Sequence, residues 1–109
     1  MKPNKYRNIK TVVDNIQFDS RKEANRYGEL QLLVRGERIT DLKLRPCFEF
    51  VVNGQMICKY IGDFSYVEKD RVSRTVEDVK SPITRKNPVY RIKRKLFEAL
   101  YPEIVFIES

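Results

Sequence analysis

The stretch IGDFSYVEKDRVSRTVEDVK, Ile61–Lys80, predicts two β-strands joined by a short polar turn. Residues 61–67 and 72–80 alternate β-branched or aromatic side chains with polar ones, and residues 68–71 are charged. The second strand ends in TVEDVK, however, and its two acids and lysine are residue types that strands tend to avoid. Such a segment fits either a solvated edge strand or a strand that carries chemistry.

Alternation along the second strand separates its charges between two faces. Successive side chains of a strand point to opposite sides, so Asp78 and Lys80 share one face and Glu77 lies on the other. Asp78 and Lys80 are two residue rises apart, roughly 6–7 Å, and can serve one site. Taken alone, the pair favours a surface ion pair of little energetic weight.

Asp63 is a second acid, in the first of the two strands. If Val67 pairs with Val72 across the turn, Asp63 lies opposite Val76 and diagonal to Asp78. Both acids then share one face, within reach of one metal ion. A register slip of one residue would turn them to opposite faces.

Glu23 is a third acid, on a predicted helix that is opened by Ser20 and stops at Gly36. At 100° per residue, Glu23 falls within the apolar stripe that Tyr27 and Leu30 define. An acid in a buried stripe needs a partner or a metal. Glu23 also stands three residues after Ser20, where a capping box explains it without further purpose.

The remaining elements indicate the fold class. In chain order we expect a hairpin over residues 11–18, extended residues 42–44, a hairpin over residues 48–60 turning at Asn53-Gly54, a basic loop over residues 81–86, a helix over residues 88–100, and a strand over residues 104–107. Residues 1–109 form one domain, with residues 1–8 as a flexible basic arm. Helices at both ends of an antiparallel-rich run indicate a mixed α/β (α+β) fold, with a central mixed sheet flanked by helices.

Composition narrows the function classes. The 109 residues carry a net charge of +7, which favours a polyanionic partner, most often nucleic acid. The absence of histidine excludes a Ser-His-Asp or Cys-His catalytic unit and any histidine-ligated zinc. No apolar run is long enough to span a bilayer and no signal peptide begins the chain, so we expect a cytoplasmic protein with free thiols at Cys47 and Cys58.

Basic residues gather in two groups. One follows the acidic strand and contains Arg85, Lys86, Arg91, Lys93, Arg94 and Lys95. The other lies on the arm and contains Lys2, Lys5, Arg7 and Lys10. Such groups suit contacts to the phosphates of DNA, although a solvated helix face accounts for part of the first. The apolar side expected for this helix is defined by Val89, Ile92, Leu96 and Leu100. Lys93 falls on that side, where it either reaches the site or extends along the rim of the stripe.

The acids and the lysine together fit metal-dependent hydrolysis of phosphodiesters. Carboxylate oxygens are the ligands that Mg²⁺ prefers, and Mn²⁺ is expected to substitute for it. The ion would activate water, and a lysine would stabilise the nucleophile or the developing negative charge. A non-catalytic DNA-binding protein on the same fold is the alternative.

Asp63 and the later Asp78-Val79-Lys80 resemble the PD-(D/E)XK nuclease motif. The order of helix with glutamate, strand with aspartate, strand with (Asp/Glu)-X-Lys and helix is similar to that superfamily's restriction-endonuclease-like core. The frame FDSRKEANRYGELQLL…GDFSY…VEDVK…VYRIKRKLFEALYP resembles a family of small phage and prophage proteins regarded as endonucleases similar to Holliday junction resolvases. The motif's proline is replaced by Gly62.

The resemblance implies roles for particular residues. Asp63, Asp78 and the Val79 carbonyl would bind the metal, Lys80 would be the catalytic lysine, and Glu23 would be an accessory acidic ligand. Glu77 remains an alternative to Asp78 if a bulge turns the strand. The implied substrate is branched DNA, cut by a homodimer, with the exposed Leu32 face of the first helix as a candidate dimer contact. Linear or nicked DNA, cut within a larger complex, is a further alternative.

Overall fold

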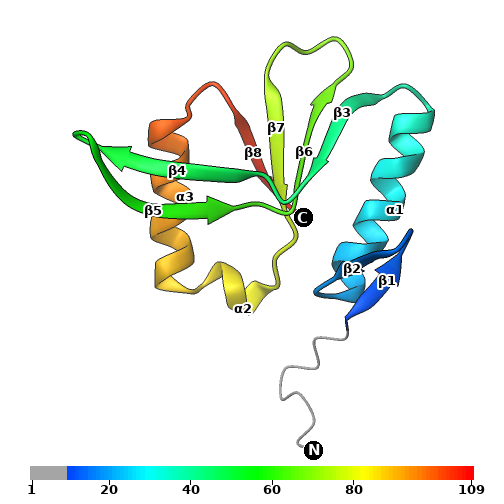
Figure 1. Cartoon of the computed structure of the whole chain (residues 1–109), viewed down its shortest axis with the longest axis horizontal. Helices are drawn as coiled ribbons and strands as arrows, with labels where there is room; N and C mark the ends of the chain where they lie inside the picture. The colour runs from blue at the N-terminus through cyan, green and yellow to red at the C-terminus, as the bar shows by residue number, and fades with distance from the viewer. Residues whose placement is uncertain (1–9) are drawn as a thin grey trace, which may run out of the picture.

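The computed structural model describes residues 10–109, and the expectations for residues 1–9, including Lys2, Lys5 and Arg7, lie outside the described residues. Its elements, in chain order, are β1 Thr11–Val13, β2 Ile16–Phe18, α1 Arg21–Arg35, β3 Ile39–Leu44, β4 Cys47–Val52, β5 Gln55–Ile61, β6 Phe64–Glu68, β7 Arg74–Asp78, α2 Pro82–Arg85, α3 Pro88–Leu100 and β8 Val105–Glu108. The central sheet has the order β3-β6-β7-β8, with β8 parallel to β7 and the other pairs antiparallel. The fold is therefore a mixed α+β sheet flanked by helices, as predicted (Figure 1).

Two apolar clusters cover opposite faces of the central sheet. On one face, Tyr27 and Leu30 of α1 pack against Phe64 and Tyr66 of β6, together with Phe18 of β2. On the other face, Val76 of β7 packs with Tyr90 and Phe97 of α3 and with Phe50 and Tyr60 of the β4–β5 hairpin. Figure 1 shows α1 on one side of the strands and α3 with the hairpin on the other.

The predicted helix boundaries are confirmed by their caps. The Ser20 hydroxyl accepts a hydrogen bond from the Glu23 N–H at 3.1 Å, and Gly36 is the C-cap of α1. Asn87 caps α3, with Pro88 at its first turn. The longest helix, α1, has 15 residues, and none of the helices in residues 10–109 is long and apolar enough to cross a membrane.

The structure corrects the predicted register between the two acidic strands. Val67 pairs with Arg74 rather than with Val72, because the loop continues to residue 73 and Val72 is fully exposed. The shift is two residues, so the alternation of side chains predicted within β7 is kept. Phe64 pairs with Glu77, and Asp63 therefore lies directly across from Asp78 rather than opposite Val76.

Two further expectations were wrong. Residues 82–85 form the short helix α2, capped by Ser81, where a loop was expected. The buried side of α3 is centred on Tyr90 and Phe97, whereas Val89 and Ile92 are exposed. The aromatic residues of the β4–β5 hairpin select this side of α3, and helix periodicity alone does not contain that information.

Candidate active site

Asp63 and Asp78 meet where the start of β6 and the end of β7 reach the same edge of the sheet (Figure 1). The Asp63 N–H donates to Asp78 Oδ1 at 3.1 Å, and the Val79 N–H donates to Asp63 Oδ2 at 2.7 Å. The Asp78 carboxylate therefore accepts from the backbone N–H of Asp63, and the Asp63 carboxylate accepts from the backbone N–H of the residue that follows Asp78. These reciprocal hydrogen bonds lie beyond the last residue pair of β6 and β7 and add to the backbone hydrogen bond from the Asp63 N–H to the Glu77 carbonyl, so they help to hold the two strand ends together.

Four of the predicted site residues line one pocket of about 290 Å³, which we call the acidic pocket: Glu23 from α1, Asp63 before β6, and Val79 and Lys80 beyond β7. Glu23 is 5% exposed, because it belongs to the inward stripe of α1. Elements that are far apart in the sequence thus bring two acids and a lysine to one concave surface.

Asp19 is an acid of this pocket that the sequence reasoning missed. It precedes the N-cap Ser20, and its position next to a helix start was the available signal. Burial, then repulsion from Asp63 and Asp19, raise the pKa of Glu23 to about 7. Burial also raises the pKa of Asp63, against the hydrogen bond from Val79 and the charge of Lys80. The pocket therefore concentrates more negative charge than its cations neutralise.

Asp78 is fully buried and faces the α3 side of the sheet, so its side chain does not line the pocket. Within residues 10–109, no hydrogen bond reaches its Oδ2. Lys80 Nζ is 3.9 Å from that oxygen. Burial raises the pKa of Asp78 to about 6, opposed by Lys80 and increased by Glu108. Lys80 is the group that connects Asp78 with the pocket.

Glu77 lies on the α1 face and is fully engaged there. It accepts hydrogen bonds from Arg26 Nε at 2.5 Å, the Tyr66 hydroxyl at 2.8 Å and the Ser109 hydroxyl at 2.7 Å. Burial alone would raise the pKa of Glu77, but the bonds from Arg26, Ser109 and Tyr66 keep it below its ordinary value. Glu77 is thus a structural anion outside the pocket, and the geometry does not favour it as an alternative ligand.

A family model described as "Protein of unknown function (DUF1064)" matches residues 3–107. The chain belongs to the DUF1064 family. No curated protein and no solved structure matches it. The family's description names no activity, so the evidence for the function of this DUF1064 protein lies in its own residues.

The candidate ligands of the DUF1064 chain fit a hard divalent cation by their chemistry. They are oxygen donors, and the Asp78 Oδ2 atom is buried without a hydrogen-bond partner in the described part of the chain. Their arrangement differs from the expectation, because Glu23 and Asp63 line the pocket and Asp78 does not. Over residues 10–109, no three Asp, Glu or Cys side chains form a group ready to hold a metal ion.

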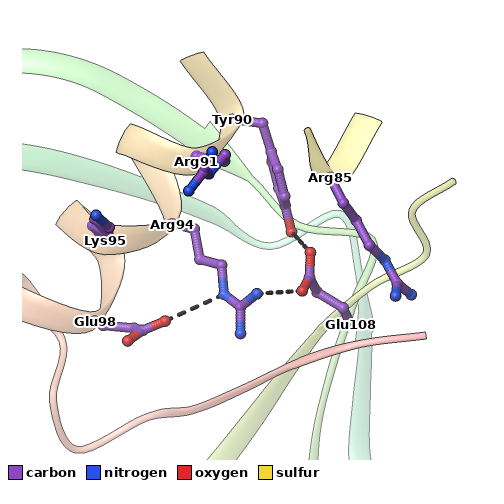
Figure 2. Close-up of a pocket in the computed structure, with 7 residues that line it drawn as sticks. All are labelled: Arg85, Tyr90, Arg91, Arg94, Lys95, Glu98 and Glu108. Carbon is purple, nitrogen blue, oxygen red and sulfur yellow. Dashed lines mark hydrogen bonds and ion pairs between the residues drawn. The ribbon is translucent and has the colours of Figure 1, made fainter. Parts of the chain in front are cut away.

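The predicted DNA-binding residues divide by position. A second hollow, which we call the basic cavity, has a volume of about 270 Å³ and is lined by Arg85, Tyr90, Arg91, Arg94, Lys95, Glu98 and Glu108 (Figure 2). Lys86 is exposed and lies outside it. Lys93 donates to the Lys59 carbonyl of β5 at 3.4 Å, which favours the rim position over the alternative in which it reaches the acidic site. The packing of α3 on the hairpin turns Lys93 towards β5.

Proposed function

We propose that this DUF1064 protein is a Mg²⁺-dependent, structure-specific DNA endonuclease with a restriction-endonuclease-like core, similar in activity to Holliday junction resolvases. The observation that carries the proposal is the pair of reciprocal hydrogen bonds at Asp63 and Asp78-Val79, beside Lys80. These bonds hold Asp63 next to the segment Asp78-Val79-Lys80 at one edge of the mixed sheet. The buried Glu23 of α1 lines the same pocket as Asp63 and Lys80. The positions of Glu23, Asp63 and Lys80 support the PD-(D/E)XK resemblance, whereas the Asp78 side chain lies outside the pocket that they line.

Each residue of the proposed site would have its own role. Glu23, Asp63 and the Val79 carbonyl would hold the ion, and the Asp78 Oδ2 atom, which has no hydrogen-bond partner among residues 10–109, would be a further oxygen donor. Mg²⁺, when bound, would supply Lewis-acid activation of water and screening of phosphate charge. Lys80, 3.9 Å from Asp78 and 5.4 Å from the centre of the Tyr90 ring, would stabilise the nucleophile or the developing negative charge. This chemistry requires no histidine.

The substrate class follows from charge and size. A net charge of +7 on 109 residues supports binding to a polyanion. The described domain has little surface for reading a long base sequence, which favours recognition of DNA shape, such as a branch. A homodimer would present two sites to the two strands of a junction. Leu32 of α1 is 64% exposed and is available for such a contact. We place the activity in the cytoplasm of a bacterial host.

Cleavage of end-labelled DNA tests the proposal. The wild type should cut a four-way junction with Mg²⁺ or Mn²⁺, and Asp63→Asn and Lys80→Ala should each lower the rate about 100-fold or more. Lys69→Ala, at the opposite edge of the sheet, is the matched control and should cut normally. Equal rates for all four proteins would refute the site. Flap, linear, nicked and single-stranded substrates in the same assay separate junction cleavage from cleavage of simpler DNA.

A second candidate function is supported by the position of Asp78. Because its side chain faces α3, the chain can also be read as a DNA-binding protein that does not cut. That function predicts salt-dependent binding to DNA, no products with either metal, and no effect of Asp63→Asn on affinity. Titration calorimetry with Mn²⁺ distinguishes the two, because only the endonuclease requires metal binding that Asp63→Asn removes.

A further inference from the structure

The basic cavity lies on the α3 side of the sheet, outside the acidic pocket. Arg85 enters it from α2, Arg91 and Lys95 from successive turns of α3, and Glu108 from the end of β8 (Figure 2). Three separate elements thus build one hollow. The acidic pocket and the basic cavity have no lining residue in common, so they form two sites rather than one.

The cavity's charge is unbalanced in favour of cations. Both of its acids are bound by Arg94, which contacts Glu98 at 3.2 Å and Glu108 through a short charged hydrogen bond. Arg85, Arg91 and Lys95 have no ion-pair partner among residues 10–109. The surplus charge lies at the mouth of the hollow, where an anion can reach it.

Arg94 is held in a defined position. Its Nε and Nη1 atoms are bound by the two carboxylates, and its guanidinium lies 5.4 Å from the centre of the Phe106 ring. Glu108 is fixed in turn by the Tyr90 hydroxyl at 2.5 Å. In Figure 2 the remaining guanidinium nitrogen has no dashed contact. A fixed donor binds a phosphate oxygen with less loss of side-chain entropy than a free one.

Tyr90 separates the basic cavity from the acidic site. Its ring is contacted by Lys80 Nζ at 5.4 Å, and its hydroxyl is bonded to Glu108 inside the cavity. Lys80 in turn lines the acidic pocket. One side chain therefore spans the distance between the catalytic lysine and the cavity. Successive phosphates of one strand are spaced at about 3.4 Å along the axis, so a strand at Lys80 has further phosphates close by.

We propose that the basic cavity binds a single internal phosphate of the nucleic-acid strand that passes Lys80, a few nucleotides from the phosphate beside the acidic pocket. The inference rests on the proposed function in that it takes the ligand to be DNA. Arg85, Arg91 and Lys95 supply charge, the free nitrogen of Arg94 supplies a fixed donor, and Glu108 and Tyr90 are positioning residues. The cavity sets where the strand lies relative to the acids.

Binding measured in EDTA tests the cavity without cleavage. The variant Arg91→Ala/Lys95→Ala should bind a labelled four-way junction about tenfold more weakly, with a slope of log affinity against log salt reduced by about 1. Arg35→Ala/Lys69→Ala removes the same charge from exposed residues at the other edge of the sheet and should bind within about twofold of wild type. Equal losses in the two double variants would overturn the proposal, because net charge alone would then explain them.

A methylphosphonate scan places the phosphate. Each internal phosphate of one strand is neutralised in turn, and one position should lower the affinity of wild type about tenfold. The same substitution should have no effect in Arg91→Ala/Lys95→Ala, since the contact is already lost. Identical scans for the two proteins would overturn the proposal. A gain in affinity from a 5′-terminal phosphate alone, absent in the variant, would also overturn it, because the cavity would then read a strand end.

The two proposals fail separately. If wild type binds with the predicted position dependence but never cuts DNA with Mg²⁺ or Mn²⁺, the endonuclease proposal fails and the phosphate site stands. If DNA is cut and the scan does not change between the proteins, the cavity proposal fails and the acidic site stands. Tyr90→Phe and Glu108→Gln add a check on positioning. Each should shift the methylphosphonate-sensitive position or broaden it, which a purely structural role would not do.

Discussion

Arg26 of α1 and Glu77 of β7 form a buried ion pair through two hydrogen bonds, 2.5 and 3.0 Å long. The pair fixes the helix that carries Glu23 to the strand that carries Asp78. Glu77 is completely buried, so Arg26→Ala would leave its charge without a cationic partner. We expect a loss of about 3 kcal/mol or more in the free energy of unfolding, measured with urea.

Two variants control this prediction. Arg35→Ala, exposed in the last turn of α1, should change stability by no more than about 0.5 kcal/mol. Adding Glu77→Gln to Arg26→Ala should recover part of the loss, because the buried charge is removed. Full stability of Arg26→Ala alone would show that the pair does not join the two elements.

Stability of the metal-free protein should depend on pH through Glu23 and Asp78. Burial raises their folded pKa values from 4.5 to about 7 and from 3.8 to about 6. A raised folded pKa means that the folded state binds the proton more tightly. The stabilisation is therefore present below pH 4 and is lost as pH rises through 6 and 7. The melting temperature in EDTA should fall between pH 4.5 and pH 8.

Glu23→Gln identifies the source of that dependence. The variant should melt at a higher temperature than wild type at pH 8 and show a flatter pH profile. Glu103→Gln, an exposed acid, should leave the profile unchanged. If Glu23→Gln retained the full slope, Glu23 would not be the acid that titrates in this range.

Magnesium should reverse the destabilisation if the acids bind it. At pH 8, with 10 mM Mg²⁺ and a dissociation constant of about 1 mM, linkage gives about 1.4 kcal/mol of added stability. Asp63→Asn retains an oxygen acceptor for the Val79 N–H, so it should fold but gain little from Mg²⁺. Scanning calorimetry measures both shifts. A gain of equal size in the variant would place the bound ion elsewhere.

Gly62 explains the departure from the nuclease motif, where a proline precedes the aspartate. Its N–H donates to the Pro46 carbonyl at 2.9 Å, a bond that proline cannot make. A Cβ at this position would lie 3.0 Å from Val76 Cγ1. We expect Gly62→Ala to cost about 1–3 kcal/mol and Gly62→Pro to cost more, measured by urea unfolding.

Gly28 supplies the matched control. Nothing lies within 4 Å of a Cβ added there, and the residue is inside α1, so Gly28→Ala should stabilise the protein by about 0.5–1 kcal/mol. If both alanine substitutions were tolerated equally, the close packing at Gly62 would not be what excludes a side chain.

The sequence predicted the local structure well because local chemistry determines it. The two ends of α1 lie at Ser20 and Gly36, which are residue types that prefer helix caps, and the β4–β5 turn lies at Asn53-Gly54, where both residues have positive φ. The predicted pairing of β6 with β7 was two residues out of register, yet Glu77 and Asp78 kept their predicted faces, because side-chain direction repeats every second residue. The prediction that Asp63 and Asp78 share one face was wrong, because Asp63 lines the pocket with Glu23 and Asp78 does not.

The site was predictable only in part, because tertiary contacts complete it. Strand alternation predicts that the Asp78 side chain points to the α3 face. How its carboxylate oxygens lie relative to Asp63 depends on the twist of the sheet and on where the two strands end. Asp19 and Glu108 have no periodic signal, since one precedes a helix cap and the other ends a strand. The contact of Lys93 with β5 was not predictable, because the aromatic hairpin, rather than helix periodicity, sets the rotation of α3.

The β4–β5 hairpin leaves and rejoins the sheet at almost one point. Arg45 N–H donates to the Asp63 carbonyl and Gly62 N–H to the Pro46 carbonyl, so the chain is pinched closed where the hairpin begins and ends. The flanking strands β3 and β6 are already neighbours in the sheet. The length and outer surface of the hairpin can therefore change during evolution without altering the geometry around Asp63 and Asp78. We expect relatives of this protein to differ most in this hairpin.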